Sequence, residues 1–181
     1  MRHILTFVAI LGVSLTGTAG SAQSGSTPEV TINFKANLVS AFKDICLDKR
    51  GNWDAAIAAA ESSAFNFQKN VSKKGKELDY IAFPLWVGLK QEKHSQHTCL
   101  AQSIIEDSPE GAAERLAEDL KALGYGLEDI EFSSMKSGLI ASLPKNPSST
   151  EPKAKPEFLE IRLEPSPLAD GVIAVLAIYP K

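Results

Sequence analysis

The sequence predicts an α+β fold, mainly an antiparallel sheet of hairpins with about three helices packed on one face. Apolar residues recur at helical spacing in two leading segments and in one later segment. The rest of the chain consists of runs rich in strand-forming residues, separated by turns and without an internal repeat. Consecutive strands joined by short turns pair antiparallel, and helices inserted among them cover one face of the sheet.

The amino terminus has the composition of a secretory signal peptide over residues 1–22. Arg2 supplies a basic start, an apolar run over residues 4–15 follows, and small residues lead to a cleavage site near Ala22. The apolar run is shorter than the roughly 20 residues that a membrane-spanning helix needs. We therefore expect a periplasmic or secreted protein.

The exported part is long enough for one domain with its own core. Removal of the leader leaves 181 − 22 = 159 residues, and one domain commonly has about 100–200. We expect a flexible tether over residues 23–30, a single α+β domain over residues 31–181 and, within it, an exposed Pro-rich loop over residues 144–156. The longest later apolar run, Val172–Tyr179, suits a buried strand and leaves the mature form without a transmembrane segment.

The charge balance excludes one class of partner. The chain has 19 basic and 22 acidic residues, and Arg2 is the only charged residue of the leader, so the mature form carries 18 − 22 = −4. Nucleic-acid binding needs clustered Lys and Arg in excess, so no nucleic-acid partner is expected.

Two helices are expected at the start of the domain. Apolar residues at helical spacing predict the first helix over Thr31–Lys49. Asn52 can cap a second, Ala-rich helix that ends near Ser62. Residues 63–79 are expected to connect this pair to the sheet.

A strand run and its return are expected next. Tyr80–Leu89 is rich in strand formers, and Pro84 within it lacks a backbone donor, which predicts an edge strand or a bulge. Residues 90–96 form a polar reversal, and residues 98–105 form the return strand.

The third helix has the clearest start signal. Ser108 is a suitable N-cap, Pro109 suits the first turn and Glu110 lies at the positive end of the helix dipole. An apolar stripe follows, and Gly124 ends the helix.

The last part of the chain predicts more strands. A short hairpin is expected from residues 129–135 and 139–143. Residues 159–163 alternate between apolar and charged side chains, which is typical of a half-buried strand. After a loop over residues 164–170, residues 172–179 are apolar on both faces and therefore suit a central strand.

The two cysteines of the chain, Cys46 and Cys99, are expected to form a disulfide. An even number of cysteines in an oxidising compartment is typical of a covalent pair. Two buried free thiols are the alternative. A redox-active pair would be a further alternative, although no Cys-x-x-Cys spacing supports it.

His94 and His97 are the two histidines beyond the leader and lie three residues apart. Two imidazoles can begin a zinc site, but zinc needs about four ligands and no third is evident. On the predicted reversal, the ordinary interpretation is that both are solvated loop side chains.

Trp53 and Trp86 are candidates for a binding groove. Because both lie in apolar patterns, packing in the core is the favoured interpretation, and Trp86 as a ligand-binding residue is the alternative.

Catalytic motifs give little support for an enzyme. Ser40-x-x-Lys43 and Ser133-x-x-Lys136 match a short motif of penicillin-recognising enzymes, but its companion motifs are missing. No catalytic residue and no cofactor is predicted.

The sequence therefore favours an exported binding or envelope accessory protein without catalytic activity, whose partner is an unknown envelope protein or a small ligand. The alternative is a small exported hydrolase or metal-binding protein that uses His94 or His97. A purely structural or chaperone-like accessory, with an exposed apolar groove or an open sheet edge near Pro84, is a third hypothesis.

Overall fold

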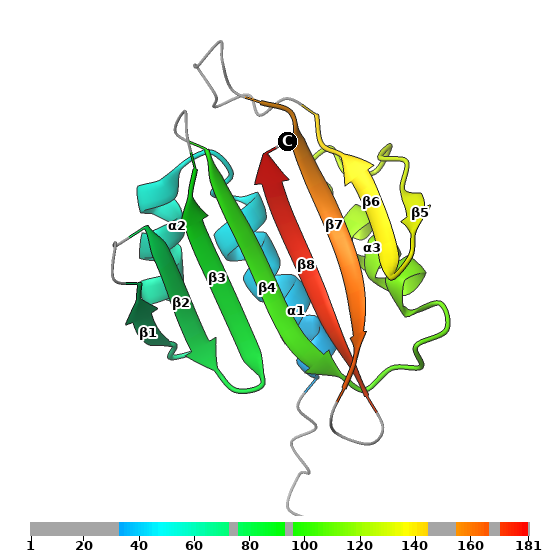
Figure 1. The fold of residues 1–181 in the computed structure, drawn as a ribbon, viewed down its shortest axis with the longest axis horizontal. Helices are drawn as coiled ribbons and strands as arrows, with labels where there is room; N and C mark the ends of the chain where they lie inside the picture. Colours follow the sequence, from blue (N-terminus) through cyan, green and yellow to red (C-terminus); the bar gives the residue numbers. More distant parts are fainter. Residues whose placement is uncertain (1–32, 73–75, 93–95, 145–154, 167–170, 181) are drawn as a thin grey trace, which may run out of the picture. The chain divides into compact units, whose positions relative to one another are not determined.

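One antiparallel sheet forms the main layer of the domain (Figure 1). The computed structural model describes residues 33–72, 76–92, 96–144, 155–166 and 171–180. The chain divides into two units, Met1–Thr31 and Ile32–Lys181, and every described residue belongs to the second.

The described residues contribute eight strands, in the spatial order β1-β2-β3-β4-β8-β7-β6-β5. They are β1 (Gln68–Val71), β2 (Glu77–Ala82), β3 (Leu85–Gln91), β4 (His97–Ile105), β5 (Ser133–Met135), β6 (Gly138–Ser142), β7 (Glu157–Pro165) and β8 (Val172–Pro180). Every neighbouring pair is antiparallel. The predicted central position of the last strand is confirmed, because β8 lies between β4 and β7.

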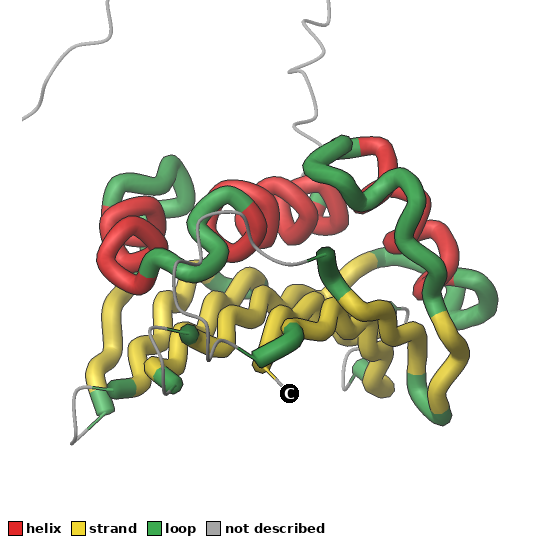
Figure 2. Tube along the Cα trace, turned by 90° about the horizontal axis from the view of Figure 1, so that it is seen from above, coloured by secondary structure: helices red, strands yellow, loops and turns green. Residues whose placement is uncertain are grey.

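The helices lie on one face of this sheet (Figure 2). They are α1 (Phe34–Ala41), which continues as the π-helix η1 (Phe42–Leu47), then α2 (Trp53–Glu61) and α3 (Ala112–Ala122). The α1 helix packs against β3 and β4, α2 against β3, and α3 against β6 and β7. The predicted α+β class, with about three helices on one face, is confirmed.

Local capping explains where the first two helices begin. The Asn52 side chain accepts a hydrogen bond from the backbone N–H of Ala55 at 3.0 Å, as the sequence predicts. Asn33 does the same for Ala36 at 2.9 Å at the start of α1. Thr31, the predicted start of the first helix, lies outside the described residues.

The core lies between the helices and the sheet, because each strand points alternate side chains toward the helices. Its largest fully buried side chains include Leu38 and Phe42 from the leading helices, Leu116 and Leu120 from α3, and Leu159, Ile161 and Leu176 from the sheet. The predicted disulfide is present: Cys46 of η1 is bonded to Cys99 of β4, with the Cα atoms 5.5 Å apart. It joins the helical layer to the middle of the sheet.

Tyr80–Leu89 is not one strand, which corrects the sequence prediction. It contains the end of β2 and most of β3, joined by a turn at Phe83 and Pro84. Pro84 therefore lies in a turn, where its missing N–H costs no ladder bond, rather than within an edge strand.

The predicted connector over residues 63–79 also contains strand structure. Gln68–Val71 forms the edge strand β1, and Glu77 begins β2. All four residues of β1 are exposed, so no apolar alternation reveals the strand in the sequence.

The third helix begins at Ala112, and Ser108 is not its N-cap. Gly111 occupies that position with a left-handed φ of 71°. Arg115 holds the preceding turn, since its guanidinium donates to the Asp107 carboxylate at 2.7 and 3.1 Å and to the Ser108 carbonyl at 2.9 Å. The carboxylate of Asp107 therefore engages an arginine side chain.

Several predicted features lie outside the described residues: the leader over 1–22, the tether over 23–30, His94, and most of the Pro-rich loop over 144–156. Within the described ranges, none of the helices combines the length and apolar character that a bilayer crossing requires.

Candidate functional site

The sheet face opposite the helices is the first candidate site. On β3, Leu85, Val87 and Leu89 are buried toward the helices, so Trp86 and Gly88 project to the other face. None of the described helices lies on that face (Figure 2). We call it the helix-free face.

The Trp86 ring lies close to Gly88 on this face. A Cβ atom placed on Gly88 would be 3.2 Å from Cζ2 of Trp86 and 3.4 Å from Cγ of Leu100. One edge of the indole therefore lies close to Gly88 and near the Leu100 side chain, and an added side chain at position 88 would displace it slightly. Trp86 is half-buried, so part of the ring remains available to solvent.

The strand register places both apolar and polar residues beside Trp86. Ile81 of β2 and Gln102 of β4 lie directly opposite it, and Asp79 lies opposite Gly88. Ile81 is 38% exposed, and Phe83 at the adjoining turn is 82% exposed. By register, Trp86 is therefore flanked by the apolar Ile81 on β2 and the amide Gln102 on β4, and Gly88 beside it is flanked by the carboxylate of Asp79.

In the half of the helix-free face that contains β7, the charged side chains of that strand pair with one another. Arg162 pairs with Glu164 at 2.9 Å and with Glu160 at 3.3 Å. This half of the helix-free face therefore offers less unpaired charge than the half around Trp86.

Trp53 and Trp86 thus differ. Trp53 packs against the core, as its apolar pattern predicts. Trp86 belongs to the helix-free face, so the favoured sequence interpretation, core packing, is wrong for this residue and the binding alternative stays a prediction.

His97 is not a solvated loop side chain, which corrects the sequence interpretation. It is the first residue of β4, is 3% exposed and packs edge-on against Trp53, with ring centroids 5.9 Å apart. Burial lowers its pKa to about 4. Its Nδ1 atom has no hydrogen-bond partner among the described residues. His97 is therefore neutral at pH 7 and faces the helix side.

The zinc hypothesis is not supported by the described part of the chain. No group of three or more potential metal ligands occurs there. His94, the other half of the predicted pair, lies outside it.

A buried polar cluster lies close to His97 at the same end of the sheet. Nε of Arg50 lies 2.8 Å from Oε2 of Glu157, and both side chains are largely buried. Burial raises the pKa of Glu157, while Arg50 and a hydrogen bond from Gln96 oppose that shift. The Gln96 amide also donates to the carbonyl of Lys155 at 2.8 Å and accepts from its N–H at 3.0 Å.

This polar cluster was missed by sequence reasoning, because its members come from segments far apart in the chain and no local pattern links them. It links the segment before β7 to the segment before β4, two strands between which β8 lies. The cluster links separate segments of the chain and does not line a cleft.

The first of the two Ser-x-x-Lys matches, Ser40 and Lys43, does not form an activated serine. The Lys43 ammonium group pairs with Asp44 and Asp48, both at 3.1 Å. Hydrogen bonds to Tyr125 and these carboxylates raise its pKa, so it holds its proton rather than accepting one from Ser40. Ser133 and Lys136 lie on β5 and in the turn that follows it.

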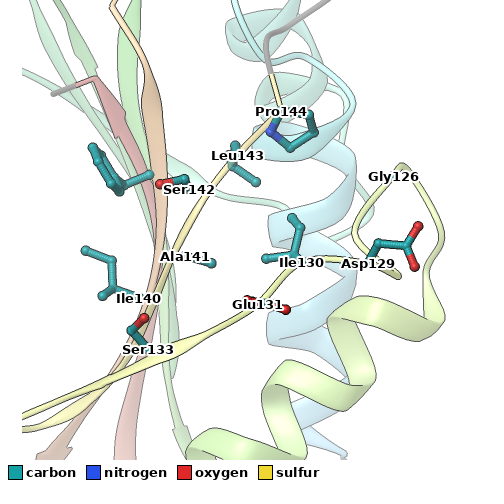
Figure 3. A pocket seen from close by; sticks show the side chains of 11 residues that line it. Gly126, Asp129, Ile130, Glu131, Ser133, Ile140, Ala141, Ser142, Leu143 and Pro144 are labelled. Carbon is teal, nitrogen blue, oxygen red and sulfur yellow. The ribbon is translucent and has the colours of Figure 1, made fainter.

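A pocket of about 600 Å³ is the second candidate site. It opens beside β6 (Figure 3), the strand next to β5 at the edge of the sheet opposite β1. Its lining combines Asp129 and Glu131 with apolar side chains, among them Ile140 and Phe158.

Comparisons with known proteins give this chain no relative: no protein-family model, no curated protein and no solved structure matches it.

Proposed function

We propose that this protein is an exported binding domain of the cell envelope without catalytic activity, and that its ligand or partner contacts the helix-free face at Trp86. The observation that carries the proposal is the position of this ring. The half-buried ring lies next to Gly88 on a sheet face that no described helix covers, and Ile81 opposite it on β2 is exposed.

Aromatic side chains in such positions are suited to binding. Tryptophan brings a large, rigid apolar surface at a small cost in side-chain entropy, and it is enriched among residues that dominate binding energy. Ile81 and Phe83 extend the apolar surface, and Asp79 and Gln102 add polar groups that can orient a ligand.

Export is supported by two independent features. The composition of residues 1–22 is that of a cleaved leader. The disulfide between Cys46 and Cys99 belongs to an oxidising compartment.

His97 gives the hydrolase alternative no support. A general base has to reach the proton that it removes, and His97 is 97% buried under Trp53 on the helix side of the sheet.

The proposal is tested by capture from cell-envelope extract with the tagged chain and three variants. We expect the wild type to retain a specific partner, Trp86→Ala to lose it and Trp86→Phe to keep part of it, because phenylalanine preserves an aromatic surface. Ser134→Ala, an exposed change on the other face, is the matched control. Circular dichroism checks that each variant is folded.

Two results would contradict the proposal. The first is a partner that Trp86→Ala retains as well as the wild type does. The second is cell fractionation that finds the chain in the cytosol with its leader attached, because that removes the envelope as the place of action.

A further inference from the structure

We infer that a short extended peptide carrying lysine or arginine binds alongside β6, in the pocket at that edge of the sheet. This site is separate from Trp86, since β4, β8 and β7 lie between β3 and β6. The inference does not rest on the function proposed above.

The edge of β6 is only partly covered by β5. Pairing between the two strands ends at Ser133 and Ile140. The ladder between β6 and β7 continues further, because the N–H of Leu143 donates to the carbonyl of Glu157 at 3.0 Å. The end of β6 therefore has a strand partner on one side only.

The backbone of Ser142 faces the uncovered side. Successive residues of a strand direct their N–H and C=O groups to opposite sides. Since Leu143 bonds to β7, the backbone N–H and C=O of Ser142 point to the opposite side of β6, which β5 does not cover there. An unpaired donor and acceptor on a strand edge are the groups that strand addition uses.

The pocket lies on this uncovered side of β6. Figure 3 shows Ala141 and Ser142 on β6, Leu143 just after it, and Asp129, Ile130 and Glu131 on the segment beside it. Ile130 is 7% exposed, which anchors that segment in the core just before β5 begins. A volume of about 600 Å³ is within the roughly 300–1,000 Å³ of typical ligand sites.

The acidic side chains of the pocket favour a positively charged peptide. Asp129 and Glu131 are both exposed and line the pocket, and neither forms an ion pair with another described residue. Unpaired carboxylates beside a binding edge favour a positively charged partner. Apolar lining from Ile140 and Phe158 on the helix-free face suits the alternate side chains of an extended segment.

The other sheet edge provides the contrast. The N–H of Ser72 donates to Glu77 at 2.9 Å, so the outward groups of β1 belong to Lys69 and Val71. Lys69 is paired with Glu61, which places a cation on this short edge strand. Short, lysine-bearing edges resist strand addition, so β1 serves as an internal control.

The test measures fluorescence anisotropy of a labelled hexapeptide of alternating valine and lysine on addition of the full chain. Two matched probes are the same peptide with glutamate in place of lysine, and the lysine peptide with N-methylated backbone at alternate positions. We expect saturable binding of the lysine peptide and binding at least about tenfold weaker for both controls, because each loses a whole class of contact.

Protein variants locate the site. Ser142→Pro removes the outward donor without breaking the ladder to β7 and should weaken binding about tenfold. Ser142→Ala, and Val71→Pro on the β1 edge, should leave it unchanged. Glu131→Gln should weaken it about two- to fivefold, as for an exposed ion pair.

The inference is overturned by any of three results. They are absence of binding up to about 1 mM peptide, equal binding of the parent and N-methylated peptides, and equal binding by wild type and a folded Ser142→Pro variant. Self-association of the chain that Ser142→Pro abolishes would also overturn it, because the edge would then belong to a second copy. Trp86→Ala should leave peptide binding intact, so this test fails or succeeds independently of the proposed function.

Discussion

The two faces of the sheet are built from the same strands but differ in how far their side chains are buried. On β4, the residues facing the helices are buried and include Cys99 and His97, whereas the alternate residues, such as Leu100 and Gln102, remain half-buried on the helix-free face. The helix side also carries the disulfide and the largest fully buried side chains.

Substitutions on the two faces should therefore have different effects. Burial of apolar surface is the main favourable term in folding, so changes on the helix side should lower the free energy of unfolding. Changes around Trp86 should alter binding more than stability.

The largest effect is expected from the disulfide. Replacing Cys46 and Cys99 together with alanine should lower the free energy of unfolding by about 4 kcal/mol, because the bond spans 53 residues of sequence and restricts the unfolded chain. Urea unfolding of the variant and of the wild type measures this. Reduction of the wild type should reproduce the loss, and stability unchanged by either treatment would show that the helical layer is held without the bond.

A smaller, pH-dependent effect is expected from His97. Its pKa is about 4 in the folded protein and 6.5 unfolded, so between these values the unfolded state binds more protons and stability falls as the pH falls. The loss between pH 7.5 and pH 4 should be about 3 kcal/mol. Because the raised pKa of Glu157 acts in the opposite direction, the effect has to be isolated with a variant.

The comparison is therefore between the wild type and His97→Leu, each unfolded in urea at pH 7.5 and at pH 4. The wild type should lose about 3 kcal/mol more than the variant over this range. An equal loss in both proteins would mean that His97 is protonated in the folded state already at mild acidity, and that this end of the helix side admits water.

The fold class was predictable because its signals are local. Helical spacing identified all three helical segments, and the alternation over residues 159–163 identified β7. The turn at Phe83 and Pro84 was missed because it lies within a continuous apolar run and has no glycine or asparagine to mark it. The polar edge strand β1 was missed because it buries nothing.

The site residues were predictable only in part. The disulfide followed from the cysteine count and the expected compartment. The environment of His97 did not, because it is created by Trp53, which packs on it from a distant helix. The pairing of Arg50 with Glu157 depends on the same kind of long-range contact.

The smallest effect on stability, and the sharpest probe of the helix-free face, is expected from Gly88→Ala. The added methyl group would lie 3.2 Å from the Trp86 ring, so the indole has to move outward. Loss of this packing is offset by the roughly 0.5–1 kcal/mol that alanine gains over glycine within a strand, so the free energy of unfolding should change by less than about 1 kcal/mol. Tryptophan fluorescence should shift to longer wavelength as the ring becomes more exposed, and capture of the envelope partner should weaken. A large loss of stability with unchanged fluorescence would instead mean that Trp86 is part of the structural core, and the contrast between the two faces would then be wrong at the residue on which it depends most.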